Sequence, residues 1–371
     1  MKISIISNYT FASSLPDDLK AIHQYGSESM SATLAKECNR SNEVVFYAPV
    51  GSSRIGEYHP LKRTDGRYLV SDLLSDVSLD NSKAEDLLSS DFVIDMTPWA
   101  NNIQELALYN DYYKYLCYRL GYKDYLHPNL DPKLKHHITH CQYFADLYER
   151  AGFPGCQVAH FGISDFWNNN TTPNDTAFFY SYFNERYELI PGGYLLFPHR
   201  HNVEKGSFLV LKLAEQFPKE TFVFSSAAVL PDHIAQLNEL KAQVVNKTLT
   251  NVKFVQFPSV PDREYYRREL YRNAKCTLSP FIANEGYHDT GGILSMESIK
   301  CGTPVIVTRS PGSEEILGHQ EDKGVFFIDG YESLKLLVRY ADFMGLIPEP
   351  WKWTIENYVN EYMNAIHNII N

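Results

Sequence analysis

The sequence predicts an α/β fold with more than one domain, and three observations lead to it. The chain has 371 residues, which is more than one compact hydrophobic core usually holds. Short apolar runs alternate with longer segments of helical spacing, which is typical of parallel strands connected by helices. Hydrophobic residues make up 44% of the chain and charged residues 21%, so the composition supports packed cores and excludes a disordered chain.

The N-terminal half opens with a strand, a loop and a helix. Residues 2–7 form an apolar strand, a loop containing Gly26 follows, and a helix is expected from about 29 to 39. Met30 and Leu34 give that helix its apolar face. The further strands predicted in this half are 44–48, 92–95 and 115–118.

Histidines of this half raise the question of a metal site. His136, His137 and His140 are close in sequence, but they lack partner ligands at zinc-site spacing. We therefore interpret this stretch as strand and loop, and we predict no metal site. His127 stands beside a proline in the loop after strand 115–118, where a histidine is either incidental or part of a site.

The middle of the chain is predicted to be a linker over 166–190. Residues 168–175 are polar and lack periodicity. The aromatic run 178–183 is expected to be a strand or a packing segment, and an acceptor-binding platform is the alternative.

The C-terminal half places two cations between a strand and a helix. Residues 194–197 are an apolar strand, Arg200 and Lys205 follow it, and an apolar helix comes next. Ligands of open α/β sheets bind at the carboxyl ends of strands, and both cations suit a diphosphate there. Further strands are predicted at 222–226, 252–255, 277–281 and 305–307.

The segment 285–317 carries the most specific pattern in the chain. Gly291 and Gly292 precede a helix that begins at Ile293, so an anion can approach the free N–H groups of that helix closely. Glu297 lies eight positions after Asp289, so both carboxylates can face one ligand. A glycine and a proline end the helix before strand 305–307, and residues 310–313 are predicted to be a turn before the next helix.

This segment resembles the nucleotide-sugar site of retaining glycosyltransferases with the GT-B architecture, particularly family 4. The family pattern is a Glu, seven residues, a second Glu and then CGTPVI. Here Asp289 takes the first position and Glu297 the second. Because Asp is shorter than Glu, Glu285 is the alternative for the first role, although the spacing favours Asp289.

Two other stretches bear on the same resemblance. Arg200 and Lys205 match the family element G-R-x4-K-G in spacing, with His199 in place of its first glycine. The family's Gly-Gly pair in the first loop is reduced to Gly26, and His127 lies where some members place a histidine near the transferred sugar.

The resemblance implies two Rossmann-like doubly wound domains that face a central cleft. The boundaries expected are an acceptor domain over 1–165, a linker over 166–190 and a nucleotide-sugar domain over 191–350. A helix over 351–371 is expected to cross back to the first domain.

It also implies transfer of a hexose or pentose from a nucleotide-diphosphate sugar, with retention and without a cofactor or an obligatory metal. A UDP-sugar is favoured over a GDP-sugar. Gly291, Gly292 and Ile293 would bind phosphate, Arg200 and Lys205 would neutralise the leaving diphosphate, and Glu297 would bind the ribose. Asp289 or Glu285 would hold the sugar.

Charge and cysteines limit the partners and the compartment. A net charge of −11 argues against an electrostatic grip on nucleic acid or anionic lipid. Six cysteines without a C-x-x-C pair suit a reducing compartment. No targeting segment or spanning helix is visible, so we expect a cytoplasmic protein, with peripheral membrane contact left open because many such enzymes use lipid-linked acceptors.

The acceptor stays open among a glycan, a lipid-linked glycan and a small molecule. Two alternative functions also remain. One is a nucleotide-sugar-binding or epimerase-like protein that lacks transfer, and the other is a viral-type transferase acting on modified DNA bases, against which the acidic charge counts.

Overall fold

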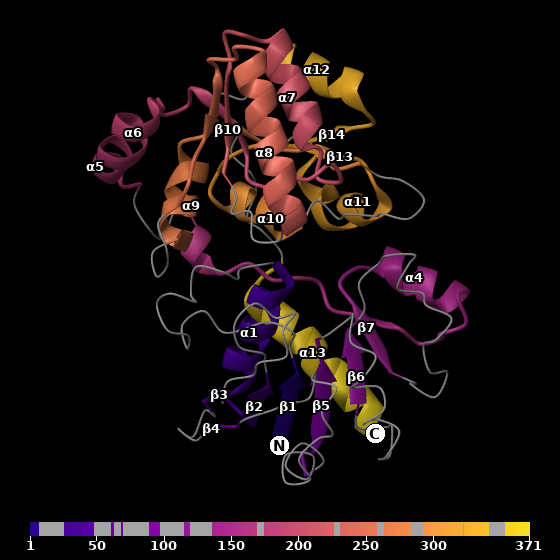
Figure 1. Ribbon diagram of the computed structural model, residues 1–371. Coiled ribbons are helices and arrows are strands. Elements are labelled where there is room, and N and C mark those ends of the chain that lie inside the picture. The colour runs from indigo at the N-terminus through magenta and orange to yellow at the C-terminus, as the bar shows by residue number, and fades with distance from the viewer. Residues whose placement is uncertain are drawn as a thin grey trace. The chain divides into compact units, whose positions relative to one another are not determined.

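The computed structural model describes the chain in segments, and its backbone clusters into two units (Figure 1). Unit 1 comprises Met1–Gly162 and Trp353–Asn371, and unit 2 comprises Ile163–Lys352. Each is described by itself. The described residues are 1–6, 26–47, 61–62, 68–69, 89–96, 115–118, 136–168, 174–225, 231–257, 263–282, 292–321, 323–340 and 353–371.

Unit 1 is built on a parallel six-stranded sheet of order β2-β1-β5-β6-β7-β8. The strands are β1 (Lys2–Ile6), β2 (Glu43–Tyr47), β5 (Phe92–Asp95), β6 (Tyr115–Tyr118), β7 (His137–Thr139) and β8 (Gln157–Val158). The strands β3 (Leu61–Lys62) and β4 (Tyr68–Leu69) pair separately as an antiparallel ribbon. His137 lies in β7, so the interpretation of the histidine stretch as strand and loop is confirmed.

The helices of unit 1 join its two sequence segments. Those in the described residues are α1 (Gly26–Cys38), α4 (Gln142–Arg150) and α13 (Ile355–Ile370). α1 packs on α13 near the sheet, and the Tyr358 hydroxyl donates to the Met30 carbonyl at 3.5 Å (Figure 1). The prediction that Gly26 lies in a loop is wrong, because α1 already begins at this residue. The exact first residue of a helix depends on local capping contacts, and the presence of a glycine nearby does not reveal those contacts.

Unit 2 has a second parallel six-stranded sheet, of order β11-β10-β9-β12-β13-β14. The predicted α/β fold class is therefore confirmed in both units. The strands are β9 (Tyr194–Phe197), β10 (Thr221–Phe224), β11 (Val252–Phe254), β12 (Cys276–Ser279), β13 (Val305–Thr308) and β14 (Val325–Ile328).

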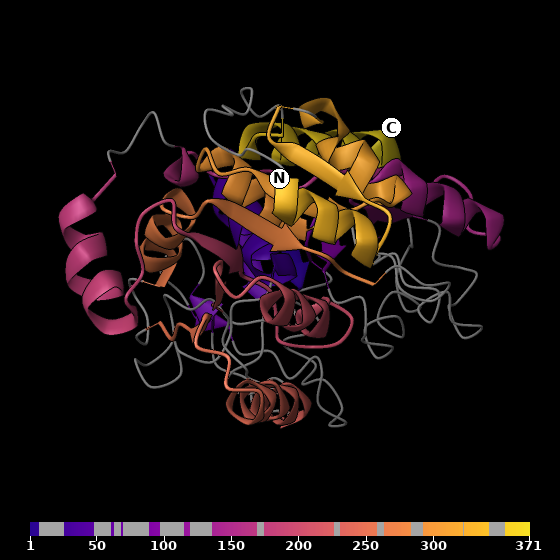
Figure 2. The same ribbon diagram turned by 90° about the horizontal axis from the view of Figure 1, so that it is seen from above.

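Helices cover both faces of this second sheet. They are α7 (Ser207–Gln216), α8 (Pro231–Asn246), α9 (Arg263–Arg272), α10 (Gly292–Lys300), α11 (Pro311–Leu317) and α12 (Tyr331–Tyr340), and the short turn η6 (Gly318–Gln320) follows α11. α7 and α8 lie together on one face, as Figures 1 and 2 both show, and they share one buried core with α12. Right-handed crossovers place α9, α10 and α11 on the opposite face. In the described part of the chain, every helix is too short or too polar to span a bilayer.

The aromatic run 178–183 is a helical packing segment, so of the two structures predicted for it the strand is wrong and the packing segment is confirmed. It lies within α5 (Thr176–Phe179) and η5 (Tyr180–Asn184), which come after the turn η4 (Asp165–Trp167) and before α6 (Glu185–Tyr187). The Asp175 side chain caps α5 by accepting from Phe178 N at 2.9 Å. Phe179 and Phe183 are four residues apart and fully buried. Helical packing and a good N-cap thus outweigh the β propensity of aromatic residues.

Residues 310–313 also differ from the predicted turn. Ser310 is the N-cap of α11, and Pro311 is its first residue. The Ser310 hydroxyl accepts from Ser313 N at 3.1 Å, and the Ser313 hydroxyl accepts from Ser310 N at 2.8 Å. This reciprocal capping box satisfies two N–H groups, and proline at the first helical position already has the required φ.

Candidate functional site

The candidate site of unit 2 lies where the strand order reverses, between β9 and β12. After β9 the chain proceeds to β10 and β11 on one side, whereas after β12 it proceeds to β13 and β14 on the other. Open α/β sheets bind ligands outside the carboxyl ends of strands at such a point. The loop 198–206 begins at the carboxyl end of β9, and residues 280–282 begin at that of β12.

The loop after β9 presents Arg200 and Lys205 on an ordered turn. Both cations are partly buried. Asn202, which is 4% exposed, holds the turn. Its side-chain oxygen accepts from Lys205 N at 3.3 Å, and its main-chain oxygen accepts from the Ser207 hydroxyl at 3.0 Å. These two hydrogen bonds, the second of them buried, fix the backbone that carries the cations.

Gly206 allows this loop to lie directly against the segment after β12. Its φ is +80°, and a Cβ atom there would stand 2.0 Å from the Pro280 carbonyl oxygen. Only glycine meets both conditions without strain. Ile282 N also donates to the Glu204 carbonyl at 2.9 Å, and the Thr308 hydroxyl donates to the Phe281 carbonyl at 2.7 Å. The carboxyl-end segments of β9, β12 and β13 are therefore tied together.

The helix α10 begins at Gly292, whose φ of +66° is left-handed. Ile293 follows it and is buried. The free N–H groups and the dipole of a helix N-terminus favour an anion. Gly292 and Ile293 therefore lie at the start of α10, and their proximity to Arg200 and Lys205 stays a prediction.

Glu297 lies on α10 and forms an ion pair with Arg267 of α9. The Glu297 side chain is only 7% exposed and that of Arg267 13%. Burial raises the pKa of Glu297, and the Arg267 guanidinium acts in the opposite direction. Burial alone would lower the pKa of Arg267, but Glu297 raises it, so the guanidinium stays charged. The predicted contact of Glu297 with a ribose stays a prediction.

Arg267 is a residue that the sequence analysis missed. It precedes Leu270 and Tyr271 on α9 by one helical turn, and both of these are buried. An arginine on the buried face of a helix needs a carboxylate partner, because an unpaired buried charge is costly. That mismatch between residue type and helix face was the available signal.

Several predicted site residues lie outside the described part of the chain. These are His127, Glu285, Asp289 and Gly291. Gly26 is at the first position of α1, after the carboxyl end of β1 in unit 1. Within the described residues, no three His, Cys, Asp or Glu side chains are grouped as they would be around a metal ion.

Residues 191–341 match the sequence profile of the family described as glycosyl transferases group 1. These residues lie within unit 2, and they include β9, the Arg200 loop and α10. No curated protein sequence matches the chain. Within unit 2, residues 191–341 are thus similar to glycosyl transferases group 1, which supports the main resemblance inferred from the motifs.

Solved structures of similar fold cover nearly the whole chain. HepE of Anabaena, in complex with UDP and glucose, is 16% identical with a TM-score of 0.64, over 100% of this chain and 97% of that one. A glycosyltransferase of Rickettsia africae is 13% identical with a TM-score of 0.69, over 100% and 98%. Sucrose-phosphate synthase of Thermosynechococcus elongatus is 13% identical with a TM-score of 0.66, over 99% and 96%. The fold of the chain is GT-B, with two Rossmann-like units.

Proposed function

We propose that this protein transfers a hexose or pentose from a nucleotide-diphosphate sugar, and that the donor is a UDP-sugar. Arg200 and Lys205 neutralise the diphosphate as it leaves, where negative charge develops in the transition state. Gly291, Gly292 and Ile293 receive a phosphate at the start of α10. Glu297 accepts hydrogen bonds from the ribose, and Asp289 or Glu285 holds the sugar.

The observation that carries the proposal is the arrangement at the carboxyl ends of β9 and β12. Gly206 and the Ile282–Glu204 hydrogen bond bring the cation-bearing loop against the segment that leads to α10. A forked cation and a point charge are thus carried by a loop that lies against the segment after β12, at the strand-order reversal, and both suit a diphosphate. The family match over 191–341 supports the same reaction class.

We further propose retention at the anomeric carbon and catalysis without an obligatory metal. Two protein cations and a helix dipole can carry the charge that a divalent ion carries in other transferases. Product stereochemistry measured by NMR tests the first part. Turnover measured in chelator and then with added Mg²⁺ or Mn²⁺ tests the second, and a strict requirement for either ion would overturn it.

A thermal-shift screen across nucleotide sugars tests the donor. A ligand that binds only the folded protein increases the free energy of unfolding by mass action, by about 2.7 kcal/mol at a ligand concentration of a hundred times its Kd. The melting temperature rises accordingly. We expect the largest shift with a UDP-sugar, followed by slow release of free sugar from that donor. Binding without any sugar release or transfer would favour the epimerase-like alternative, and an absence of shift with every nucleotide would overturn the proposal.

A further inference from the structure

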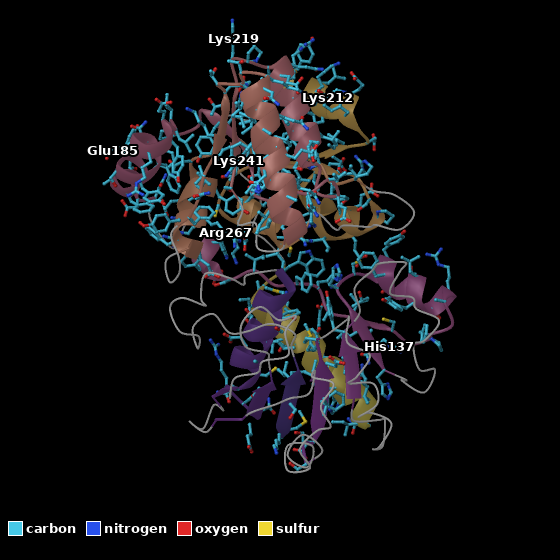
Figure 3. The ribbon with its side chains drawn as sticks, in the orientation of Figure 1. His137, Glu185, Lys212, Lys219, Lys241 and Arg267 are labelled. Carbon is cyan, nitrogen blue, oxygen red and sulfur yellow. The ribbon has the colours of Figure 1, made fainter. Side chains whose placement is uncertain are left out.

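Arg267, which is labelled in Figure 3, contacts both a tryptophan and a carboxylate of α10. Its guanidinium carbon is 5.1 Å from the centre of the Trp167 ring, and its terminal nitrogen pairs with Glu297. Trp167 is 5% exposed. A planar guanidinium that stacks on an aromatic face and meets a carboxylate edge-on has few alternative orientations. The side chain of Arg267 is therefore held in place from two directions.

The helix α10 is attached to the same region by a second cation. Lys300, at the last residue of α10, donates to the Ile163 carbonyl at 2.9 Å and to the Asp165 carboxylate at 2.8 Å. The segment that contains Trp167 is thus bonded to α10, and through Arg267 it contacts Glu297 as well. Trp167, Arg267 and α10 form one connected assembly within unit 2.

We propose that Arg267 is a positioning residue for nucleotide recognition: it orients the Glu297 carboxylate and keeps it ionised for the ribose hydroxyls. This inference rests on the proposed function, because it assumes that Glu297 binds the ribose. An ionised carboxylate accepts hydrogen bonds from two hydroxyls better than a protonated one does. A buried carboxylate stays ionised only beside a compensating charge, and Arg267 supplies it.

A neighbouring ion pair on α9 provides the matched control. Arg272 pairs with Glu269 at 3.2 Å, and both side chains are fully buried. Arg272 also donates to the Asn168 carbonyl at 3.0 Å. Loss of Arg272 therefore removes a buried cation from the same helix, but its ion-pair partner lies on α9 itself rather than on α10. A general structural role for the α9 arginines would give the two variants equal effects on ribose recognition.

The experiment compares the affinities of UDP and 2′,3′-dideoxy-UDP, which lacks the ribose hydroxyls. In the unmodified protein and in Arg272→Leu we expect UDP to bind ~10-fold tighter or more, the scale of hydrogen bonds to a charged group. Arg267→Leu and Glu297→Gln should each bring this ratio close to one while leaving dideoxy-UDP affinity nearly unchanged. The double variant should show no further loss, because both changes disable one carboxylate.

The pH dependence separates positioning from packing. Burial raises the pKa of Glu297, the Arg267 guanidinium and a hydrogen bond from Tyr271 oppose that rise, and the charge of Glu264 adds to it, so the pKa stays above its usual value. In Arg267→Leu the UDP preference should therefore recover as pH increases and the carboxyl ionises, whereas Arg267→Leu/Glu297→Gln should stay flat. Arg267→Lys keeps the positive charge and is the variant expected to fold normally. It should retain part of the UDP preference at neutral pH.

The outcomes also distinguish a failure of the positioning role of Arg267 from a failure of the ribose-binding role of Glu297. If Glu297→Gln loses the preference and both Arg267 variants keep it, the positioning role is overturned and the proposed function stands. If the unmodified protein binds neither nucleotide, or binds both equally, the ribose role of Glu297 fails, and the positioning role fails with it.

Discussion

Both units have a parallel six-stranded sheet whose strand order reverses once, between β1 and β5 in unit 1 and between β9 and β12 in unit 2, but the described groups at the strand ends differ. In unit 2 the segments after β9, β12 and β13 are joined by hydrogen bonds, and one of them carries Arg200 and Lys205. In unit 1 the described groups lie at the ends of β6 and β7, away from the reversal between β1 and β5, and they are buried. Tyr118 donates to or accepts from the His140 ring at 3.0 Å, and His140 stacks on Phe161 at 4.6 Å.

This difference between the strand ends of the two units indicates that sheet topology determines where a ligand can bind, whereas the side chains determine which ligand binds. Both sheets offer a reversal point, which is the general ligand position of open α/β sheets. Only unit 2 combines that position with the family pattern over 191–341. A function is therefore assigned from the residues of unit 2 rather than from the fold that the two units share.

The largest expected effect comes from the cations after β9. Arg200→Ala and Lys205→Ala should each lower turnover by ~10²-fold or more, the scale of a lost donor to a developing negative charge. Arg150→Ala is the control, since it removes an exposed cation from the end of α4 in unit 1. Initial rates at saturating donor measure the effect. Equal rates in all three variants would remove the cations from the site.

Substitutions of the two acidic residues should affect different steps, nucleotide binding in one case and sugar transfer in the other. Glu297→Ala should weaken nucleotide binding itself by ~10-fold, because the ribose is present with or without a sugar. Asp289→Ala should leave UDP affinity intact and damage transfer. Calorimetry with UDP and a transfer assay with the full donor measure the two effects. If both variants lose melting temperature and bind normally once folded, their roles are structural.

Glu285→Ala decides the first acidic position in the same series. We expect it to retain more transfer activity than Asp289→Ala, because the offset from Asp289 to Glu297 reproduces the family spacing. The reverse result, with Glu285→Ala inactive and Asp289→Ala nearly silent, would assign the sugar contact to Glu285. Asp289 would then be a capping residue ahead of α10.

A smaller effect, on stability, tests how tightly the segments of unit 2 are joined. Gly206→Ala places a methyl group against the Pro280 carbonyl at a positive φ, whereas Gly192→Ala has a positive φ but no atom within 4 Å of the new Cβ. We expect Gly192→Ala to cost ~1 kcal/mol of unfolding free energy and Gly206→Ala clearly more, because steric overlap adds to the backbone strain. Chemical denaturation measures both, and equal costs would contradict the close approach.

The strands that were predicted are mostly short apolar runs, whereas β8 (Gln157–Val158) and β14 (Val325–Ile328) were not predicted. The expected strands at 194–197 and 305–307 coincide with β9 and β13 within one residue. Such apolar runs do not show in which order the parallel strands are arranged in the sheet. It arises from crossover handedness and from which faces the helices bury, so pairing such as that of β9 with β12 required the structure.

The candidate site was predictable only where a motif is local. Arg200, Lys205 and Glu297 stand in fixed spacing to a strand or helix, and each lies on or beside the expected element, whereas α10 begins one residue earlier than predicted, at Gly292. The partnership of Arg267 with Glu297 joins residues 30 positions apart. Sequence periodicity marks both as buried-face positions, but it cannot show that α9 and α10 pack against each other.

The smallest effect concerns thiol reactivity, and it changes no activity. In unit 2, Cys276 and Cys301 are buried, and burial raises the pKa of both thiols. In unit 1, burial and then the charge of Glu37 raise the pKa of Cys38 to about 12, whereas Cys156 is only partly buried. Because the thiolate is the nucleophile, we expect iodoacetamide at pH 8 to modify Cys156 well before these three. Peptide mass spectrometry over a labelling time course measures the order, with the denatured protein as the control in which all thiols react. Labelling of Cys276 or Cys301 as fast as Cys156 would mean that β12 or the end of α10 opens in the native state, and the close joining of the segments in unit 2 would then be contradicted.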